Sequence, residues 1–245
     1  MQSSVPDESP GQSDVLRAAL SALSCGGVPG ALGAFDLDST LFDNRPRQAR
    51  IVREWGAARG EARLAPCGPE HFDGWDLRVP LRRLGFSSAE ANAAFADLKD
   101  FWGERFFTSE YCVGDAPIAG AAAFVRTVVS LGARVVYLTG RHEAMRAGTE
   151  VALAREGFPL PRAGTQVQLW MKPELGRDDD AFKREACPRL RLLGGVAAAF
   201  DNEPAHANIY RAAFPEARVV HLDTDHSGRP IALAAGILPV KDFRL

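Results

Sequence analysis

Apolar and polar positions alternate along this chain in short runs and in longer stretches with helical spacing. The short apolar runs predict buried strands at residues 31–35, 134–138, 166–171, 195–200 and 218–222. Apolar residues at helical spacing predict helices over about 13–23, 117–131, 142–156, 179–193 and 204–214. Strands that alternate with helices predict an α/β fold, a mostly parallel sheet with helices on both faces.

Residues 45–111 have a different pattern, in which apolar residues keep helical spacing and no strand-like alternation stands out. Ser87 and Glu90 have the spacing of a capping box, which predicts the start of a helix. We therefore expect a small helical domain inserted into a core domain of residues 13–44 and 112–245. Four aromatic residues of the insert are expected to form its own core rather than a cofactor site: Trp75, Trp102, Phe106 and Phe107.

Composition narrows the class of protein. The chain has 245 residues and a net charge of -2, which argues against a nucleic-acid surface held by charge alone. Its four cysteines are far apart and have no metal-binding spacing, which predicts reduced thiols in a cytoplasmic protein. No apolar run approaches the length of a membrane span, and the start of the chain lacks the apolar core of a signal peptide. Residues 1–12, rich in Ser, Pro and Gly, are expected to be disordered.

Three of the predicted strands end in polar residues. Asp36 and Asp38 follow the first strand, Thr139 ends the second and Asp201 ends the fourth. Each group alone could simply begin a turn or a helix, but in a parallel sheet all three ends lie at one edge, where ligands usually bind. Two neighbouring carboxylates repel each other, and a divalent cation such as Mg²⁺ can hold them together. One of them can then attack as a nucleophile while the other handles the proton.

These motifs resemble those of the haloacid dehalogenase (HAD) superfamily of phosphotransferases. Asp36, Asp38 and Thr40 match its first motif, Asp-x-Asp-x-Thr, and Thr139 matches its second. Either Lys183 or Lys172 matches the third, and Lys183 is favoured because it lies on the predicted helix ahead of the last motif. The resemblance implies a HAD-like Rossmannoid core, a three-layer parallel sheet. Asp201 matches the fourth motif, with Asn202 and Glu203 next to it, and which of the two helps to hold the metal is left open.

The resemblance also implies roles. Asp36 would form an aspartyl-phosphate, with Asp38 as general acid and base, and Thr139 and Lys183 would bind and neutralise the phosphoryl group. Mg²⁺ would be held by Asp36, the backbone carbonyl of Asp38, and Asp201. A phosphate ester needs a proton to leave, whereas a halide does not, so Asp38 favours a phosphatase over a dehalogenase.

The insert occupies the position of the family's C1 cap, which implies a small phosphorylated substrate. The lack of a long apolar run predicts no membrane partner. The turn-rich segment 71–76 of the insert is expected to face the aspartates, with Trp75 and Asp76 contacting the substrate together with Gly140, Arg141 and Lys172. The alternative is that Phe72 and Trp75 pack in the core of the insert and its acidic residues are solvated. Thr139-Gly140-Arg141 and the later Trp170-Met171-Lys172-Pro173 are also similar to polynucleotide 3′-phosphatase domains. That similarity leaves a nucleic-acid end as an alternative substrate, and a catalytically weak binding protein is the second alternative.

Overall fold

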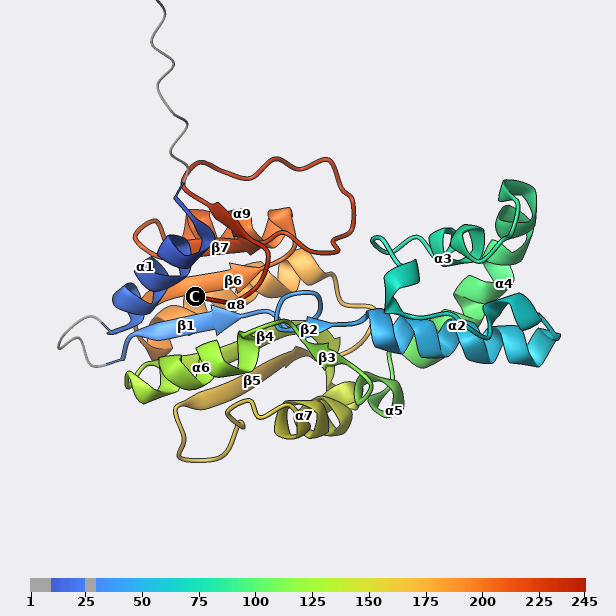
Figure 1. Ribbon diagram of the computed structural model, residues 1–245. Coiled ribbons are helices and arrows are strands. Elements are labelled where there is room, and N and C mark those ends of the chain that lie inside the picture. The colour runs from blue at the N-terminus through green and yellow to red at the C-terminus, as the bar shows by residue number, and fades with distance from the viewer. Residues whose placement is uncertain (1–9, 25–29) are drawn as a thin grey trace, which may run out of the picture.

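The computed structural model describes residues 10–24 and 30–245. Its centre is a six-stranded sheet in the order β5-β4-β1-β6-β7-β8, and every paired neighbour runs parallel (Figure 1). The predicted α/β class and the five predicted strands are confirmed. The strands are β1 (Leu32–Phe35), β4 (Arg134–His142), β5 (Val167–Lys172), β6 (Val196–Asp201), β7 (Arg218–Leu222) and β8 (Leu238–Val240).

Helices cover both faces of this sheet. Successive residues of a strand point to opposite faces, so each face has apolar side chains for helices to bury. In β4, Val135 and Tyr137 join one buried cluster and Val136 and Leu138 join the other. The first cluster contains residues of α1, α6 and α7, and the second contains residues of α8 and α9. The result is the expected three-layer core. The helices are α1 (Gln12–Ser24), α6 (Ala121–Ser130), α7 (Arg146–Arg155), α8 (Asp179–Leu193) and α9 (Pro204–Ala213).

Several boundaries differ from the prediction. Helix α1 begins at Gln12, one residue inside the segment expected to be disordered; residues 1–9 of that segment lie outside the described residues. Helix α6 begins after Pro117, because Pro117 belongs to β3 (Ala116–Pro117). Strand β4 runs on to His142, which pairs with Lys172 after a shift in register, so α7 starts only after the short 3-10 turn η3 (Glu143–Met145).

The insert contains helices and 3-10 turns only. The elements are α2 (Arg45–Arg59), η1 (Ala62–Leu64), η2 (Pro69–His71), α3 (Arg78–Arg83), α4 (Ser88–Phe106) and α5 (Ser109–Cys112). The predicted capping box is present, since Glu90 N donates to Ser87 Oγ at 3.2 Å and Ser87 N donates to Glu90 Oε2 at 2.7 Å. Helices α2, α3 and α4 lie beside the sheet rather than on a face of it (Figure 1). That the insert forms a separate domain stays a prediction.

The two ends of the insert meet in a short ribbon that the sequence did not predict. Strand β2 (Phe42–Asp43) pairs antiparallel with β3, and Ile118 N donates to Leu41 O at 2.9 Å. The chain therefore leaves the core and returns to it at one place, next to Asp36 and Asp38.

Two further expectations concern the described residues alone. Cys67, Cys112 and Cys187 are free thiols, whereas Cys25 lies outside the described part of the chain. None of the helices in residues 10–24 and 30–245 has the length and apolar character needed to cross a membrane.

One close contact joins the end of the insert to the core. A Cβ atom at Gly148 of α7 would lie 2.0 Å from the backbone oxygen of Ser109 in α5. Gly148 N also donates to Ser109 Oγ at 3.2 Å. Only a glycine lets these two backbones approach so closely.

We therefore expect Gly148→Ala to lower the free energy of unfolding by about 1–3 kcal/mol, as overpacking usually does. Gly103→Ala is the matched control, because a Cβ there meets no atom within 4 Å and removing a helical glycine adds about 0.5–1 kcal/mol. Urea denaturation of both variants measures the difference. Equal stability of the two would contradict the close contact.

Candidate active site

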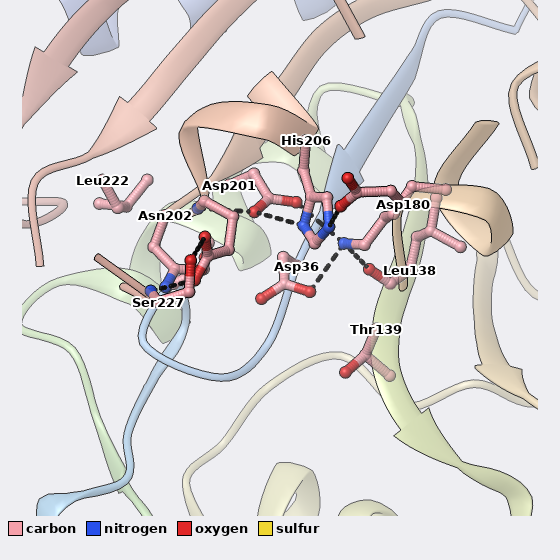
Figure 2. Close-up of polar contacts among 12 residues, drawn as sticks. Asp36, Leu138, Thr139, Asp180, Asp201, Asn202, His206, Leu222 and Ser227 are labelled. Carbon is pink, nitrogen blue, oxygen red and sulfur yellow. Dashed lines mark hydrogen bonds and ion pairs between the residues drawn. The ribbon is translucent and has the colours of Figure 1, made fainter. Parts of the chain in front are cut away.

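The polar strand ends lie side by side because β4, β1 and β6 are adjacent and parallel. Asp36 directly follows β1, and its backbone N still donates to Phe200 O of β6 at 3.0 Å. Asp201 is the last residue of β6 and Thr139 lies in β4. Figure 2 shows Asp36, Thr139 and Asp201 at this common edge.

A buried lysine joins these strand ends. Lys183 Nζ of α8 donates to Asp36 Oδ1 at 2.8 Å, to Asp201 Oδ2 at 2.9 Å and to Leu138 O at 2.6 Å. Burial disfavours its charge, but Asp201 and Asp36 outweigh that cost and hold the pKa of Lys183 above its usual value. Of the two candidate lysines, Lys183 is the one that contacts the aspartates.

The two carboxylates that share Lys183 differ. Burial, followed by repulsion from Asp201, raises the pKa of Asp36 to about 7 against the opposing effect of Lys183. Burial acts on Asp201 too, but Lys183 and His206 together hold its pKa below the usual range. Asp36 is therefore the carboxylate whose charge depends most on what binds beside it.

Lys172 lies elsewhere in the site. Its Nζ pairs with Asp179 at 2.6 Å and donates to the backbone oxygens of Leu175 and Arg177 at 3.2 and 2.9 Å. Lys172 does not contact Asp36. Because it lines the cavity, its predicted contact with the substrate would be made from the side of that cavity.

Asp38 is enclosed by cations. Its Oδ1 accepts from Arg141 Nη2 at 2.7 Å, from Arg47 Nη2 at 2.8 Å and from Asn44 Nδ2 at 2.8 Å. Both arginines also pair with buried Asp115, at 2.6 Å from Arg141 and 2.9 Å from Arg47. Burial opposes the charge of Asp38, but Arg141 and Arg47 hold its pKa well below the usual range. In this arrangement Asp38 is ionised at neutral pH.

The sequence analysis did not find Arg47, Asp115 or His206. His206 of α9 lies between Asp201 Oδ1, at 3.3 Å from Nδ1, and Asp180 Oδ1, at 3.0 Å from Nε2 (Figure 2). A charged or imidazole side chain within a helix gives no sequence signal of its own, because most such residues lie at the surface.

Asn202 and Glu203, the two candidates for helping Asp201 to hold the metal, have separate hydrogen-bond partners. Asn202 Oδ1 accepts from Thr40 Oγ1 at 3.1 Å, and Asn202 Nδ2 donates to Asp225 O at 2.6 Å. The Glu203 carboxylate accepts from Ser227 N at 2.5 Å and Ser227 Oγ at 2.8 Å. Asn202 thus ties the first motif to the loop after β7.

A cavity of about 480 Å³ opens onto these groups. Of the sequence-predicted residues it is lined by Asp36, Asp38, Trp75, Gly140, Arg141 and Lys172. Asp76 is not among the lining residues, since its Oδ1 pairs with Arg78 at 2.8 Å within the insert. Thr139, Lys183 and Asp201 lie behind the lining, and Thr139 Oγ1 accepts from Arg141 N at 3.2 Å.

Solved structures share this architecture. A Thermotoga maritima protein assigned as a beta-phosphoglucomutase matches with a TM-score of 0.53 and 15% identity, over 87% of this chain and 95% of that one. The chain has the HAD fold. Protein tyrosine kinase A (PtkA) of Mycobacterium tuberculosis matches with a TM-score of 0.52 and 18% identity, over 88% and 95%. No protein-family model and no curated protein matches the sequence.

The motif resemblance implies Mg²⁺, an ion that prefers oxygen donors. Asp36 and Asp201 each place one oxygen on the same Nζ, so their carboxylates converge. Within the described residues Asp36 Oδ2 accepts no hydrogen bond from the protein, and no group of three His, Cys, Asp or Glu side chains is arranged to hold a metal ion by itself. Mg²⁺ commonly uses one or two carboxylates and keeps several waters, so this donor set fits it.

Replacing Lys183 tests the electrostatics of this candidate site without any activity assay. Lys183→Met leaves Asp36 and Asp201 buried without their shared cation, which typically costs about 3–5 kcal/mol. Burial already raises the folded-state pKa of Asp36 above its unfolded value, and loss of the lysine raises it further. The decrease in the free energy of unfolding caused by Lys183→Met is therefore greatest at high pH. It becomes smaller as the pH falls through the folded-state pKa of Asp36.

Urea denaturation in EDTA at pH 8 and pH 5.5 measures this trend. Lys172→Met is the control, because it removes a pair with half-exposed Asp179 and should cost about 1 kcal/mol at both pH values. A Lys183→Met protein whose stability deficit is the same at both pH values would contradict the shared-cation arrangement.

Proposed function

We propose that this protein is a Mg²⁺-dependent phosphatase that hydrolyses a phosphate monoester of a small molecule through Asp36. The observation that carries the proposal is the position of the Asp36 carboxylate. One oxygen is fixed by Lys183 at 2.8 Å, and the residue lines a cavity that Gly140 and Arg141 also line. Oδ2 is thus left to act as a nucleophile toward a phosphoryl group held in that cavity.

Two displacements at phosphorus complete the reaction. Asp36 Oδ2 forms a bond to phosphorus while the bond to the leaving-group oxygen breaks, and that oxygen takes up a proton. Water then attacks the aspartyl-phosphate, gives up a proton and releases inorganic phosphate, which restores the carboxylate. Lys183 stays against Oδ1 in both steps and offsets negative charge on the nucleophile.

The proton is proposed to pass through Asp38, but the arginines constrain when this can happen. An Asp38 side chain held by Arg141 and Arg47 is ionised and cannot donate a proton. A phosphoryl group beside Arg141 competes with Asp38 for the guanidinium, and loss of that partner raises the pKa of Asp38. Arrival of the substrate therefore favours the protonated form that the leaving group needs.

The metal has a limited, defined part in this proposal. Asp36 and Asp201 would hold Mg²⁺, and the ion would offset the repulsion between an anionic nucleophile and an anionic phosphate. Burial keeps the pKa of Asp36 near 7, so an adjacent cation also favours the ionised nucleophile.

Asp36→Asn tests the nucleophile. An amide cannot form the acyl-phosphate, so we expect turnover of p-nitrophenyl phosphate to fall by about 10³-fold or more. Asp223→Asn is the control, since Asp223 lies after β7 and pairs with exposed Lys241. Near-normal turnover by Asp36→Asn would rule out the proposed intermediate.

Removing the metal tests the second part of the proposal. Treatment with EDTA should abolish turnover and added Mg²⁺ should restore it. Asp201→Asn should raise the half-saturating Mg²⁺ concentration by about 10-fold or more, because one of two carboxylate ligands loses its charge. Full activity of metal-free protein would show that the reaction does not depend on the ion.

A further inference from the structure

Four aromatic side chains of the insert line the same cavity as Asp36: Trp75, Trp102, Phe106 and Phe107. We call them the aromatic wall. Phe106 is buried, whereas the other three are only half-buried and keep part of their rings accessible. The insert therefore presents ring surface, in addition to polar groups, to whatever occupies the cavity.

The rings of the aromatic wall hold one another in place. Trp102 stacks on Phe106 with centroids 4.3 Å apart and an interplanar angle of 20°. Trp75 meets Phe106 edge to face at 5.5 Å and 86°, and Phe107 meets Trp102 at 5.4 Å and 82°. Such mutual packing leaves few rotamers open, so a ligand would find this surface already formed.

Arg47 fixes the wall relative to the proposed catalytic group Asp38. Its guanidinium lies 3.7 Å from the centre of the Phe106 ring, and Nη1 donates to Phe106 O at 2.8 Å. The same guanidinium donates to Asp38 through Nη2 at 2.8 Å. One side chain thus contacts both the wall and the aspartate that would serve the leaving group.

A second contact positions Trp75. The neighbouring Gly74 N donates to Asp225 Oδ1 at 2.9 Å, and Arg45 donates to both oxygens of Asp225 at 2.7 Å. Asp225 belongs to the loop that also binds Asn202 of the fourth motif. The turn that carries Trp75 is therefore fastened to the core domain beside the candidate site.

The main core of the insert lies elsewhere. Ala49, Val52, Trp55, Leu64, Leu81 and Leu98 belong to a separate buried cluster. The wall packs on a smaller group around Ile51, Phe106 and Tyr111, and Trp102 packs against both clusters. The expectation that these aromatic residues form only the insert's own core is thus incomplete, since they also form one side of the cavity.

The charges at the cavity limit what else the ligand can carry. The lining cations Arg141 and Lys172 are already paired, with Asp38 and Asp115 and with Asp179 respectively. Arg141 can bind the transferred phosphate, which leaves Lys172, paired with Asp179, as the one other lining arginine or lysine among the described residues. With so few lining cations and four aromatic lining residues, a ligand with one phosphate and an uncharged, planar remainder matches this cavity.

We infer that the aromatic wall binds the leaving group of the substrate by stacking, and that this leaving group carries a planar ring system, as a nucleoside does. This inference rests on the proposed function for the identity of the reacting end. Stacking on the aromatic wall has a separate consequence: a base contributes affinity beyond that of its sugar phosphate.

Adenosine 5′-monophosphate and ribose 5-phosphate test the claim, because they share the phosphate and the leaving oxygen and differ by the base. Isothermal titration of the Asp36→Asn protein with Mg²⁺ should show at least about 10-fold tighter binding of the nucleotide, the order expected for base stacking on aromatic rings. Trp75→Ala in that background should remove most of the preference and leave ribose 5-phosphate binding unchanged.

Trp170→Ala is the matched control, since Trp170 is half-buried on β5, outside this cavity, with Arg189 over its ring at 4.4 Å. It should keep the full preference. Trp75→Phe, which retains a ring in the same turn, should keep most of it. These two variants separate stacking from a general loss of structure.

Equal affinities for the two ligands would overturn the inference, even if the wild-type protein hydrolyses p-nitrophenyl phosphate. A nucleotide preference that depends on Trp75 in a protein without phosphatase activity would support the wall and refute the proposed reaction. Binding of a 3′-phosphorylated oligonucleotide far tighter than that of adenosine 3′-monophosphate would overturn the small-molecule assignment.

Discussion

The candidate site depends on one buried ammonium. Lys183 reaches from α8 to Asp36 after β1, to Leu138 O in β4 and to Asp201 at the end of β6. Without it, two carboxylates would face each other in a region of low dielectric, where repulsion is strong. Helix α8 can supply this lysine because Phe182, Ala186 and Leu190 anchor it to the sheet. The charge balance between Asp36 and Asp201 therefore depends on how α8 packs against the sheet.

The two aspartates of the first motif experience opposite environments although they are two residues apart. Burial raises the pKa of Asp36, while Arg141 and Arg47 lower that of Asp38. Each shift opposes the role that the proposed reaction needs, a charged nucleophile and a protonated acid. A cation beside Asp36 and a phosphate beside Arg141 would each reverse one shift. On this account the resting site is held inactive by its own charges, and the reactants themselves complete it.

The sequence predicts the strands and the polar residues at their ends, because both follow a simple local pattern. Apolar runs that end in Asp36, Thr139 and Asp201 revealed both the strands and the edge at which they meet, because parallel strands align their ends. Strand β8 was missed, since it has three residues, one of them Pro239. Arg47 and Asp115 were missed because their pairing brings together segments far apart in the chain, and no local spacing encodes such a contact. Long-range ion pairs of this kind become visible only once the insert is folded against the core.

The ribbon of β2 and β3 has a consequence for how such a chain can diversify. Because the insert departs and returns at one point, its length and internal packing can change without altering the order or register of the six-stranded sheet. With one exception, the groups assigned to the reaction come from outside the insert, so substrate preference and chemistry can be inherited separately. Arg47 is the exception, since it belongs to α2 and binds Asp38. A graft of a foreign insert onto this core would have to carry an arginine at that position to preserve the charge balance at Asp38.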